Sequence, residues 1–397
     1  MKILTINSGS SSLKFSIYRI EKNEMLEYKG EISRIGMDEG IFEIYDVSDN
    51  EVINKQVRVQ NHNESLKMLF KWLEENSSNE NIAVVGHRLV HGGTRFIEPV
   101  ILDDNAIHHL KELIPLAPEH LPHEIKAIKI IKEEFPEIEQ VACFDTSFHH
   151  HMPRIAKSVP INLKMWNEGI RRYGFHGLSY EYIIQELEKE AGSKIFSERI
   201  IIAHLGNGAS MAAIKNGKSV DTTMGFTPAG GLVMGTRSGD LDPGIIVYLQ
   251  KEKNFTAESV NKLVNEKSGL LGLSGSSSNM KDLLERQEKD ENAKLAIDIF
   301  CYQAKKYLGG LINVLGGLDT LVFTAGIGEN SSEIRRRICE NTEYLGLKID
   351  ERRNTNNDKI ISSENSKIVV RVMKTNEELM IARHSKNIVN KKVSQMV

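Results

Sequence analysis

Residues 1–60 alternate between apolar and polar positions, which is the pattern of half-buried strands. The period then changes, and four apolar residues follow at the spacing of one helix face, namely Leu66, Leu69, Phe70 and Leu73. We therefore expect a meander of strands at the N-terminus, followed by a helix.

Short apolar runs alternate with helical spacing after this helix. Residues 82–86 and 140–145 have the length and character of buried strands, and the segment 124–135 between them has the spacing of a helix that ends before Pro136. A strand meander followed by alternating strands and helices indicates a mixed α/β domain.

The same order of elements begins again near residue 199. Residues 199–220 read as an apolar strand, a small polar turn, a second strand and an Asn216-Gly217 hairpin turn, as residues 2–28 do at the start of the chain. A helix, a strand, a second helix and a last strand are expected to follow, at 292–314, at 320–324, from Ser331 and at 367–372. The repeated order predicts two similar α/β domains.

Two segments fit neither pattern. Residues 268–280 are rich in glycine and serine, so we expect a loop there. The tail from Lys386 is polar and basic, and we expect it to fray.

Composition excludes several classes of protein. The chain has 397 residues, is 40% hydrophobic and carries a formal net charge of -3, so it has no general attraction for nucleic acid or an anionic membrane. Its three cysteines are far apart and form no C-x-x-C pair, which argues against a disulfide framework and a cysteine zinc site. The N-terminus does not resemble a signal peptide and no apolar run is long enough to cross a membrane, so we expect a cytoplasmic protein.

Two small polar turns are candidates for binding phosphate. The first, in NSGSSSLKF at residues 7–15, offers backbone N–H groups, serine hydroxyls and the ammonium of Lys14. The second follows the strand at residue 199 and contains Gly206-Asn207-Gly208. Each could instead be a flexible polar turn, but one at the start of each half favours a bound nucleotide. A P-loop is absent, and neither this turn nor Gly326-Ile327-Gly328 completes a dinucleotide fingerprint.

Arg88, His176 and Arg237 each lie in a glycine-rich segment. Alone, an arginine at a strand end such as Arg88 is either a structural salt bridge or an anion clamp. Together the three groups suit transfer of a phosphoryl group to an anion.

The other histidines carry less information. His87 and His91 have helical metal-ligand spacing, but the accompanying glutamate is missing and glycines flank them, which argues against zinc. The run His149, His150 and His151 is expected to be solvated surface.

The chain resembles the acetate kinase family, within the actin-like superfamily of sugar kinases and chaperone ATPases. The motifs that carry the resemblance span nearly the whole chain and are, in order, NSGSSSLKF, GHRLVHGG, FDTSFH, RRYGFHG, HLGNGAS, MGTRSGDLDPG, SGLLGLSG, FTAGIGENS and TNEELMIAR. The resemblance implies two actin-like (ribonuclease H-like) domains of βββαβαβα topology, with the active site in the cleft between them. The expected domains are residues 1–150, with 382–397 packing back on them, and 151–381, which would carry most nucleotide contacts.

The resemblance also implies roles for individual residues. It implies Arg88, Asp145, His176 and Arg237 in catalysis. It implies an acyl site of Arg88, Val90, His120, Phe175 and Pro228, and a site for Mg²⁺ (or Mn²⁺) at Asn7 and Glu377. It implies that ATP or ADP is bound by Ser10, Ser12, Lys14, His204, Leu205, Gly206, Asn207, Gly208, Asn279, Met280, Lys281, Gly326, Ile327, Gly328, Glu329 and Asn330.

Two segments depart from the family pattern. Residues 277–282 read SSNMKD where the family has S-S-D-x-R-D, which puts the nucleotide preference in question. Residues 117–122 read APEHLP where the family has A-P-L-H-N-P. Glu119 therefore either points into the acyl site, paired or protonated, or turns to solvent, and we expect the second because exposed glutamates are the rule.

The expected reaction transfers the γ-phosphoryl group of ATP to a short-chain carboxylate, most readily acetate, by direct in-line transfer in a homodimeric enzyme. A carboxylate is already ionised at neutral pH, so no general base is needed, and Asp145 is better suited to orienting the nucleophile or holding the metal. Two alternatives remain open. One is a kinase that prefers propionate or butyrate, and the other is a nucleotide-gated binding or filament protein of the same fold.

Overall fold

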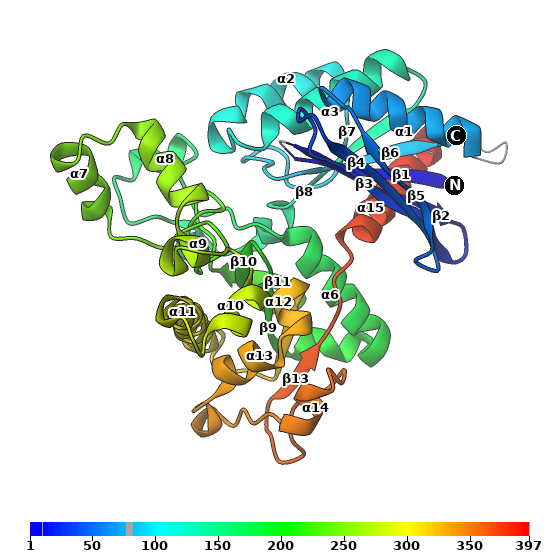
Figure 1. The fold of residues 1–397 in the computed structure, drawn as a ribbon. Coiled ribbons are helices and arrows are strands. Elements are labelled where there is room, and N and C mark those ends of the chain that lie inside the picture. The colour runs from blue at the N-terminus through cyan, green and yellow to red at the C-terminus, as the bar shows by residue number, and fades with distance from the viewer. Residues whose placement is uncertain (10, 77–81, 397) are drawn as a thin grey trace. The chain divides into compact units, whose positions relative to one another are not determined.

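The computed structural model describes residues 1–9, 11–76 and 82–396. They divide into two compact units, which are shown in Figure 1. Unit 1 consists of residues 1–147 together with the described residues from Asn376 onward, and unit 2 consists of Phe148–Thr375.

The described part of unit 1 contains a sheet of eight strands in the order β5-β4-β3-β2-β1-β6-β8-β7. Strands β1, β6 and β8 are parallel to one another, and β1 to β5 form an antiparallel meander. The strands are β1 (Lys2–Ser8), β2 (Ser12–Ile20), β3 (Glu24–Ser33), β4 (Gly40–Asp46), β5 (Glu51–Val57), β6 (Val84–Leu89), β7 (Val100–Ile101) and β8 (Glu139–Phe144).

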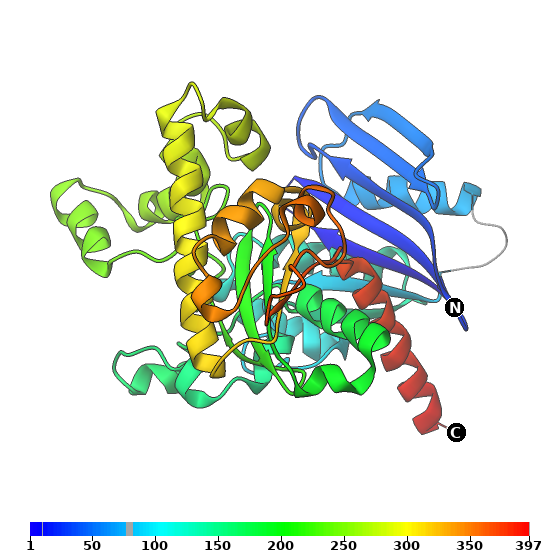
Figure 2. The ribbon, with the colours of Figure 1, turned by 90° about the horizontal axis from the view of Figure 1, so that it is seen from below.

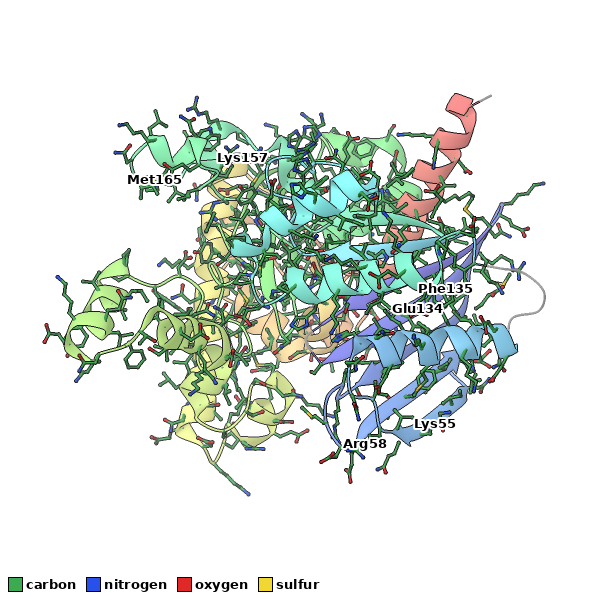
Figure 3. All side chains as sticks on the ribbon, turned by 90° about the horizontal axis from the view of Figure 1, so that it is seen from above. Lys55, Arg58, Glu134, Phe135, Lys157 and Met165 are labelled. Carbon is green, nitrogen blue, oxygen red and sulfur yellow. The ribbon has the colours of Figure 1, made fainter. Side chains whose placement is uncertain are left out.

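Helices cover both faces of this sheet, with α1 and α3 on one face and α15 on the other (Figure 1). The helices are α1 (His62–Asn76), α2 (Asp104–Glu112), α3 (Leu121–Glu134) and α15 (Glu377–Met396). At the end of α3, the ring of Phe135 stacks on Phe70 of α1 with 3.8 Å between centroids, and Glu134 pairs with Lys67 at 2.9 Å (Figure 3). These contacts fix the two helices side by side over the core.

The sheet of unit 2 has five strands among the described residues, in the order β11-β10-β9-β12-β13. Strands β9, β12 and β13 are parallel, and β9 to β11 are antiparallel. The strands are β9 (Arg199–Leu205), β10 (Ala209–Lys215), β11 (Lys218–Thr222), β12 (Thr320–Thr324) and β13 (Val369–Val372).

Helices α6 and α11 lie on opposite sides of this second sheet (Figure 2). Helix α11 is capped at its start by the Asp290 carboxylate and ends at Gly316, whose positive φ suits glycine. The helices of unit 2 are α4 (Arg154–Lys157), α5 (Lys164–Asn167), α6 (Gly177–Ala191), α7 (Pro243–Glu252), α8 (Ala257–Glu266), α9 (Gly269–Ser274), α10 (Met280–Arg286), α11 (Glu291–Leu315), α12 (Ala325–Asn330), α13 (Ser332–Cys339) and α14 (Glu351–Thr355).

The two sheets share one plan. The order β3-β2-β1-β6-β8 in unit 1 corresponds to β11-β10-β9-β12-β13 in unit 2, with three antiparallel strands followed by parallel ones in each. The predicted α/β fold with two similar halves, each beginning with a strand hairpin, is therefore confirmed.

Three local expectations are wrong. Residues 269–274 form helix α9, which ends at Gly275 with a φ of 66°, where we expected a loop. Helix α15 continues to Met396 instead of fraying from Lys386, whose ammonium donates to the carbonyl of Glu21 at 2.9 Å. His149 is fully buried, and its ring bonds to the Ser219 hydroxyl at 2.8 Å and the Phe175 carbonyl at 3.0 Å.

Among the described residues, no helix is long and apolar enough to span a bilayer.

Helix α15 lies very close to the sheet at Gly86 of β6. A Cβ atom at this position would lie 2.4 Å from the Ser385 Oγ and 2.6 Å from the Ile381 Cγ2. Both atoms belong to side chains packed in the interior, so neither can move aside without disturbing its neighbours. The close approach matters for the site because α15 begins with Glu377.

We expect Gly86→Ala to destabilise unit 1 by about 1–3 kcal/mol, the usual result of overpacking a core. Gly309→Ala is the matched control, because no described atom lies within 4 Å of the Cβ it adds in helix α11, and alanine favours a helix by up to about 1 kcal/mol. Chemical denaturation of the two variants measures the difference. Equal stabilities would show that α15 does not pack on β6 in this way.

Candidate functional site

The turn between β1 and β2 is tied to its surroundings through backbone groups. The Gly9 N–H donates to the Ser12 carbonyl at 2.9 Å, and His62 Nε2 donates to the Gly9 carbonyl at 2.8 Å. The Ser8 hydroxyl is buried and has no hydrogen-bond partner within the described residues. Ser10, predicted to bind phosphate, lies outside the described residues.

Lys14 lies on β2 opposite Asn7, the predicted metal ligand on β1. Its side chain is 55% exposed and its ammonium is 3.9 Å from the Glu31 carboxylate. An exposed ion pair at this distance contributes little stabilising energy. The Lys14 ammonium can therefore turn to an incoming anion at small cost.

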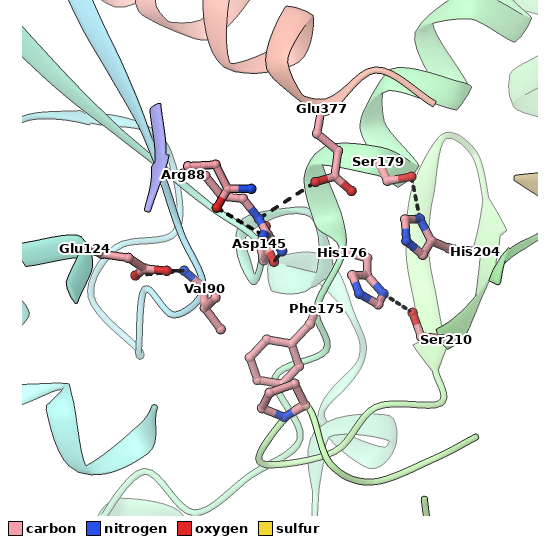
Figure 4. Close-up of polar contacts among 12 residues, drawn as sticks. Arg88, Val90, Glu124, Asp145, Phe175, His176, Ser179, His204, Ser210 and Glu377 are labelled. Carbon is pink, nitrogen blue, oxygen red and sulfur yellow. Dashed lines mark hydrogen bonds and ion pairs between the residues drawn. The ribbon is translucent and has the colours of Figure 1, made fainter. Parts of the chain in front are cut away.

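Arg88 is the centre of a polar cluster at the carboxyl ends of the parallel strands of unit 1 (Figure 4). Its Nε and Nη2 donate to the two oxygens of Asp145 at 3.1 and 2.7 Å, and its Nη1 donates to the Asn7 Oδ1 at 3.4 Å. Glu377, the first residue of α15, lies 3.8 Å from the same guanidinium. Three neighbouring strands and one helix terminus thus bring together four residues that were predicted for the site.

Carboxylates outnumber cations in this cluster. Burial, the largest single effect, opposes the charge of Arg88, but Asp145 and Glu377 outweigh it and raise the pKa of the guanidinium. Burial raises the pKa of Glu377 to about 7, an effect that Arg88 opposes and Asp145 reinforces. An additional cation would relieve the repulsion between these acids.

The donor set fits Mg²⁺. Oxygen atoms of Asn7 and Glu377 are ligands of the type that this ion prefers. The described residues contain no group of three or more His, Cys, Asp and Glu side chains placed to hold a metal. Mg²⁺ does not require one, because it usually takes one or two carboxylates and completes its shell with water and substrate phosphates.

Glu124, which we did not predict, is a buried acid beside this cluster. It is 3% exposed, and both of its carboxyl oxygens lie 3.3 Å from the Val90 N–H (Figure 4). Burial raises its pKa to about 8, although Arg88 and the Val90 N–H favour the ionised form. At neutral pH Glu124 is therefore mainly a neutral carboxylic acid, next to a residue predicted for the acyl site.

Glu119 and His120 precede helix α3. Glu119 is exposed, as expected of a residue that turns to solvent. The His120 carbonyl accepts from the Glu124 N–H at 3.2 Å in the first turn of the helix. The buried carboxyl group of this segment thus belongs to Glu124 and not to Glu119.

The turn between β9 and β10 in unit 2 is closed by a hydrogen bond from the Gly206 N–H to the Gly208 carbonyl at 3.0 Å. A Cβ at Gly208 would lie 3.2 Å from His176 Nε2 and 3.7 Å from Arg237 Nη1. Arg237 Nη1 also donates to the Pro228 carbonyl at 3.3 Å. The structure thus brings an imidazole and a guanidinium to one glycine of this turn.

His176 and His204 stack with 4.1 Å between ring centroids. Helix α6 holds both rings, since His176 is its N-cap residue and Ser179 bonds to His204 Nδ1 at 2.8 Å (Figure 4). The buried ring of Phe175 precedes them in the chain.

A cavity of about 460 Å³ lies beside the same turn, in unit 2. It is lined by Gly206, Asn207, Ser278, Asn279, Met280, Lys281, Leu284, Gly326, Ile327, Asn330 and Ser331, most of which were predicted to bind the nucleotide. The Asn279 side-chain oxygen accepts from the Lys281 N–H at 2.9 Å and caps helix α10. This cap fixes the start of α10, which lies at the cavity.

Five residues of unit 2 that were predicted to bind the nucleotide do not line this cavity, namely His204, Leu205, Gly208, Gly328 and Glu329. Leu205 is fully buried at the end of β9, and Gly328 is buried within α12. The Glu329 carboxylate accepts from the N–H groups of Ala325 at 2.8 Å and Thr375 at 3.1 Å. Glu329 thus holds the backbone of the site in place.

Comparison with known proteins agrees with the motifs. The sequence pattern of the Acetokinase family matches residues 2–383. Acetate kinase of Coprothermobacter proteolyticus is 44% identical over 398 residues, which cover 98% of this chain and 99% of that protein. This chain belongs to the acetokinase family.

Solved structures of acetokinase family members have the same fold. The propionate kinase from Francisella tularensis subsp. tularensis SCHU S4 matches with a TM-score of 0.92 at 37% identity, over 98% of this chain and 99% of that one. The acetate kinase from Porphyromonas gingivalis matches with a TM-score of 0.89 at 36% identity and the same coverage. The resemblance drawn from the motifs is confirmed.

Arg335 is a second residue of the site that we did not predict. It is fully buried and donates to the carbonyls of Gly328 and Glu329 at 2.8 and 3.0 Å, and to both oxygens of Asn354 at 2.8 Å. It therefore fixes the last turn of α12, which lines the cavity of unit 2. Its place in the run 335–337 of three arginines gave no sign of burial.

We expect Glu124→Gln to remove a pH dependence of stability. The Glu124 pKa is about 8 in the folded chain against an ordinary 4.5. Between these values the unfolded chain releases the proton while the folded chain keeps it, so stability falls as the pH rises, by up to about 1.4 kcal/mol per pH unit. The melting temperature of the variant, relative to that of wild type, should therefore rise as the pH is raised from about 5 to 8.

Melting curves of Glu124→Gln that stay parallel to wild type would contradict a buried neutral Glu124.

Proposed function

We propose that this protein transfers the γ-phosphoryl group of ATP to a short-chain carboxylate, most readily acetate, and catalyses the reverse reaction as well. Membership of the acetokinase family supports this function. The observation that carries it is the placement of His176 and Arg237 against Gly208. A nucleotide-gated binding protein would need the β9–β10 turn to bind phosphate. It would not need the imidazole of His176 and the guanidinium of Arg237 beside that turn.

The chemistry requires an anion to approach a polyanion. An acid of this class has a pKa near that of Glu, about 4.3, so it is a ready nucleophile at neutral pH. Two unit charges 4 Å apart repel by roughly 4 kcal/mol at an effective dielectric constant near 20. We propose that Arg88, Arg237 and Lys14 offset this repulsion, and that transfer is in line with no covalent enzyme intermediate.

In this proposed scheme, Asp145 acts indirectly, through its contact with Arg88. Its two oxygens grip the guanidinium, which fixes the plane in which Arg88 presents its remaining N–H groups. We therefore assign Asp145 to orientation of the nucleophile, with no proton transfer.

Asn7 and Glu377 are the residues that we propose hold Mg²⁺, or Mn²⁺ in its place. Bound there with ATP, the ion would supply positive charge that offsets the charge of the phosphates. The residues lining the cavity of unit 2 are proposed to hold the nucleotide, with Arg335 and Glu329 keeping their backbone in place.

The acid itself has two candidates. Val90, His120, Phe175 and Pro228 are proposed to contact its acyl group. Propionate is the alternative to acetate, because the solved propionate kinase is as similar in fold as the acetate kinases are. Comparing kcat/KM for acetate, propionate and a hydroxy acid decides between them.

Trapping the acyl phosphate with hydroxylamine tests the activity directly. Wild type with ATP, Mg²⁺ and acetate should form the hydroxamate, and Arg237→Ala should lower kcat by about two to three orders of magnitude, as removal of other preorganised donors does. ATP binding should change little. A variant that keeps more than half of the wild-type kcat would remove Arg237 from the site, and a wild type that traps no product with any of the acids would refute the function.

We further propose that the protein is cytoplasmic and forms a homodimer, with no nucleic acid or membrane as partner. Helix α7 supports the dimer, because none of its residues is buried although it is largely apolar. Ile245, Val247 and Tyr248 are 44%, 48% and 53% exposed. A surface of this kind is typical of protein interfaces.

Val247→Glu is expected to convert the dimer to a monomer, since it places a charge in an apolar contact. Light scattering should give wild type about twice the chain mass of 44.7 kDa and the variant about one chain mass. Val52→Glu, at a valine that is 43% exposed in unit 1, should remain dimeric. Wild type at one chain mass would contradict the dimer.

A further inference from the structure

Three buried side chains of unit 2 form a continuous series of hydrogen bonds. The Tyr180 hydroxyl lies 2.5 Å from the Ser210 Oγ, and the same Oγ lies 2.8 Å from His176 Nδ1. Tyr180 and Ser210 are fully buried and His176 nearly so. Figure 4 shows the ring of His176 directed at Ser210. The series connects a phenol that has no role in the scheme above to a ring that we assign to phosphoryl transfer.

Helix geometry explains why two residues reach the same serine. His176 is the N-cap residue of α6 and Tyr180 lies in the first turn of the helix, four residues later. The Tyr180 N–H donates to the His176 carbonyl at 3.1 Å and locks that turn. On the other edge of the imidazole, His176 Nε2 faces Gly208. The ring thus has one nitrogen in the interior and one at the β9–β10 turn.

Two features beside His176 disfavour a positive charge on its ring. It stands at the N-terminus of α6, where the helix dipole disfavours a further positive charge, and the Arg237 guanidinium approaches the same glycine, Gly208. A neutral imidazole carries a single N–H, and the partner of one nitrogen decides which nitrogen carries it.

The two tautomers differ in what they offer a phosphate. With the proton on Nε2, His176 donates a hydrogen bond to an oxygen near Gly208. With the proton on Nδ1, Nε2 presents a lone pair, which repels that oxygen. Only the first tautomer can stabilise a transferring phosphoryl group.

We propose that Tyr180 is a positioning residue that fixes the tautomer of His176, an inference that rests on the proposed function. The phenol donates to the Ser210 Oγ, the Ser210 hydroxyl consequently donates to His176 Nδ1, and the His176 N–H is left on Nε2. This direction follows from acidity, because a phenol, with a pKa of about 10, is a far better donor than an aliphatic hydroxyl.

Nitrogen NMR of wild type labelled with ¹⁵N-histidine tests the tautomer without any substrate. The signals of His176 are found among those of the 13 histidines by their loss in His176→Gln. We expect Nε2 to carry the proton and Nδ1 to be the acceptor. A proton on Nδ1 would overturn the proposal. Because no reaction is involved, this outcome is independent of whether the proposed function holds.

Tyr180→Phe removes only the hydroxyl and keeps the ring. The centroid of this ring lies 6.0 Å from that of Phe148 and 6.4 Å from that of His204. We expect a fall in kcat of about 5- to 20-fold, smaller than for a donor that touches the substrate, with KM for ATP and the acid within about twofold of wild type. The NMR signals should shift towards a mixture of tautomers. Wild-type kcat with unchanged signals would refute the role.

Ser210→Ala breaks the same series at its centre and guards against a Tyr180 variant that fails to fold. Its loss should equal or exceed that of Tyr180→Phe, and the double variant should lose no more than Ser210→Ala alone. Tyr173→Phe is the matched control, since this buried tyrosine donates to the Gly169 carbonyl at 2.7 Å outside the series, and it should keep wild-type kcat. Additive losses in the double variant would contradict a shared series.

Discussion

The balance of charge around the Arg88 guanidinium constrains everything else in the site of unit 1. A buried guanidinium must be paired, and Asp145 meets that need with both oxygens. Glu377 and Glu124 add two more acids, so one cation faces three carboxyl groups. Burial raises the pKa of both Glu377 and Glu124, so protonation removes part of this negative charge at neutral pH. In the proposed function, a divalent cation held by Asn7 and Glu377 would offset this surplus of acids.

Unit 2 depends in a similar way on the register of one helix. The apolar side of α6 packs Tyr180, Ile183 and Leu187 against the sheet, which fixes the rotation of the helix about its axis. That rotation carries the first turn of α6 to the β9–β10 turn, with His176 at the cap in a left-handed conformation. Non-glycine residues adopt this conformation at some energetic cost, which the burial of the helix offsets. Packing of the apolar face thus decides where the imidazoles stand.

The sequence was sufficient for the parts of the site that follow from local pattern. Periodicity and the neighbouring glycines pointed to Arg88 at a strand end, and the resemblance to the acetate kinase family named Asn7, Asp145 and Glu377, which lie around it. The buried polar groups could not be named, because burial depends on partners remote in the chain. Glu124 sits on the apolar face of α3, and its partner Val90 is 34 residues away. His149 lies in a polar run, and Ser219, which makes it a core residue, is 70 residues away. Composition alone cannot distinguish such residues from solvated ones.

The chain passes between the units twice, and each passage adjoins a residue of the site. Asp145 lies two residues before the boundary at 147/148, and Glu377 lies one residue after Asn376, where the chain returns to unit 1. Asn376 accepts from the Tyr18 hydroxyl and Thr375 is held by Ser179 and Glu329, so the return is anchored on both sides of the boundary. Further along α15, Ile381 and Ser385 pack against Gly86 of β6, which also holds the helix in place. The packing of a C-terminal helix therefore holds Glu377 against Arg88, although 289 positions (377 minus 88) separate them in the sequence.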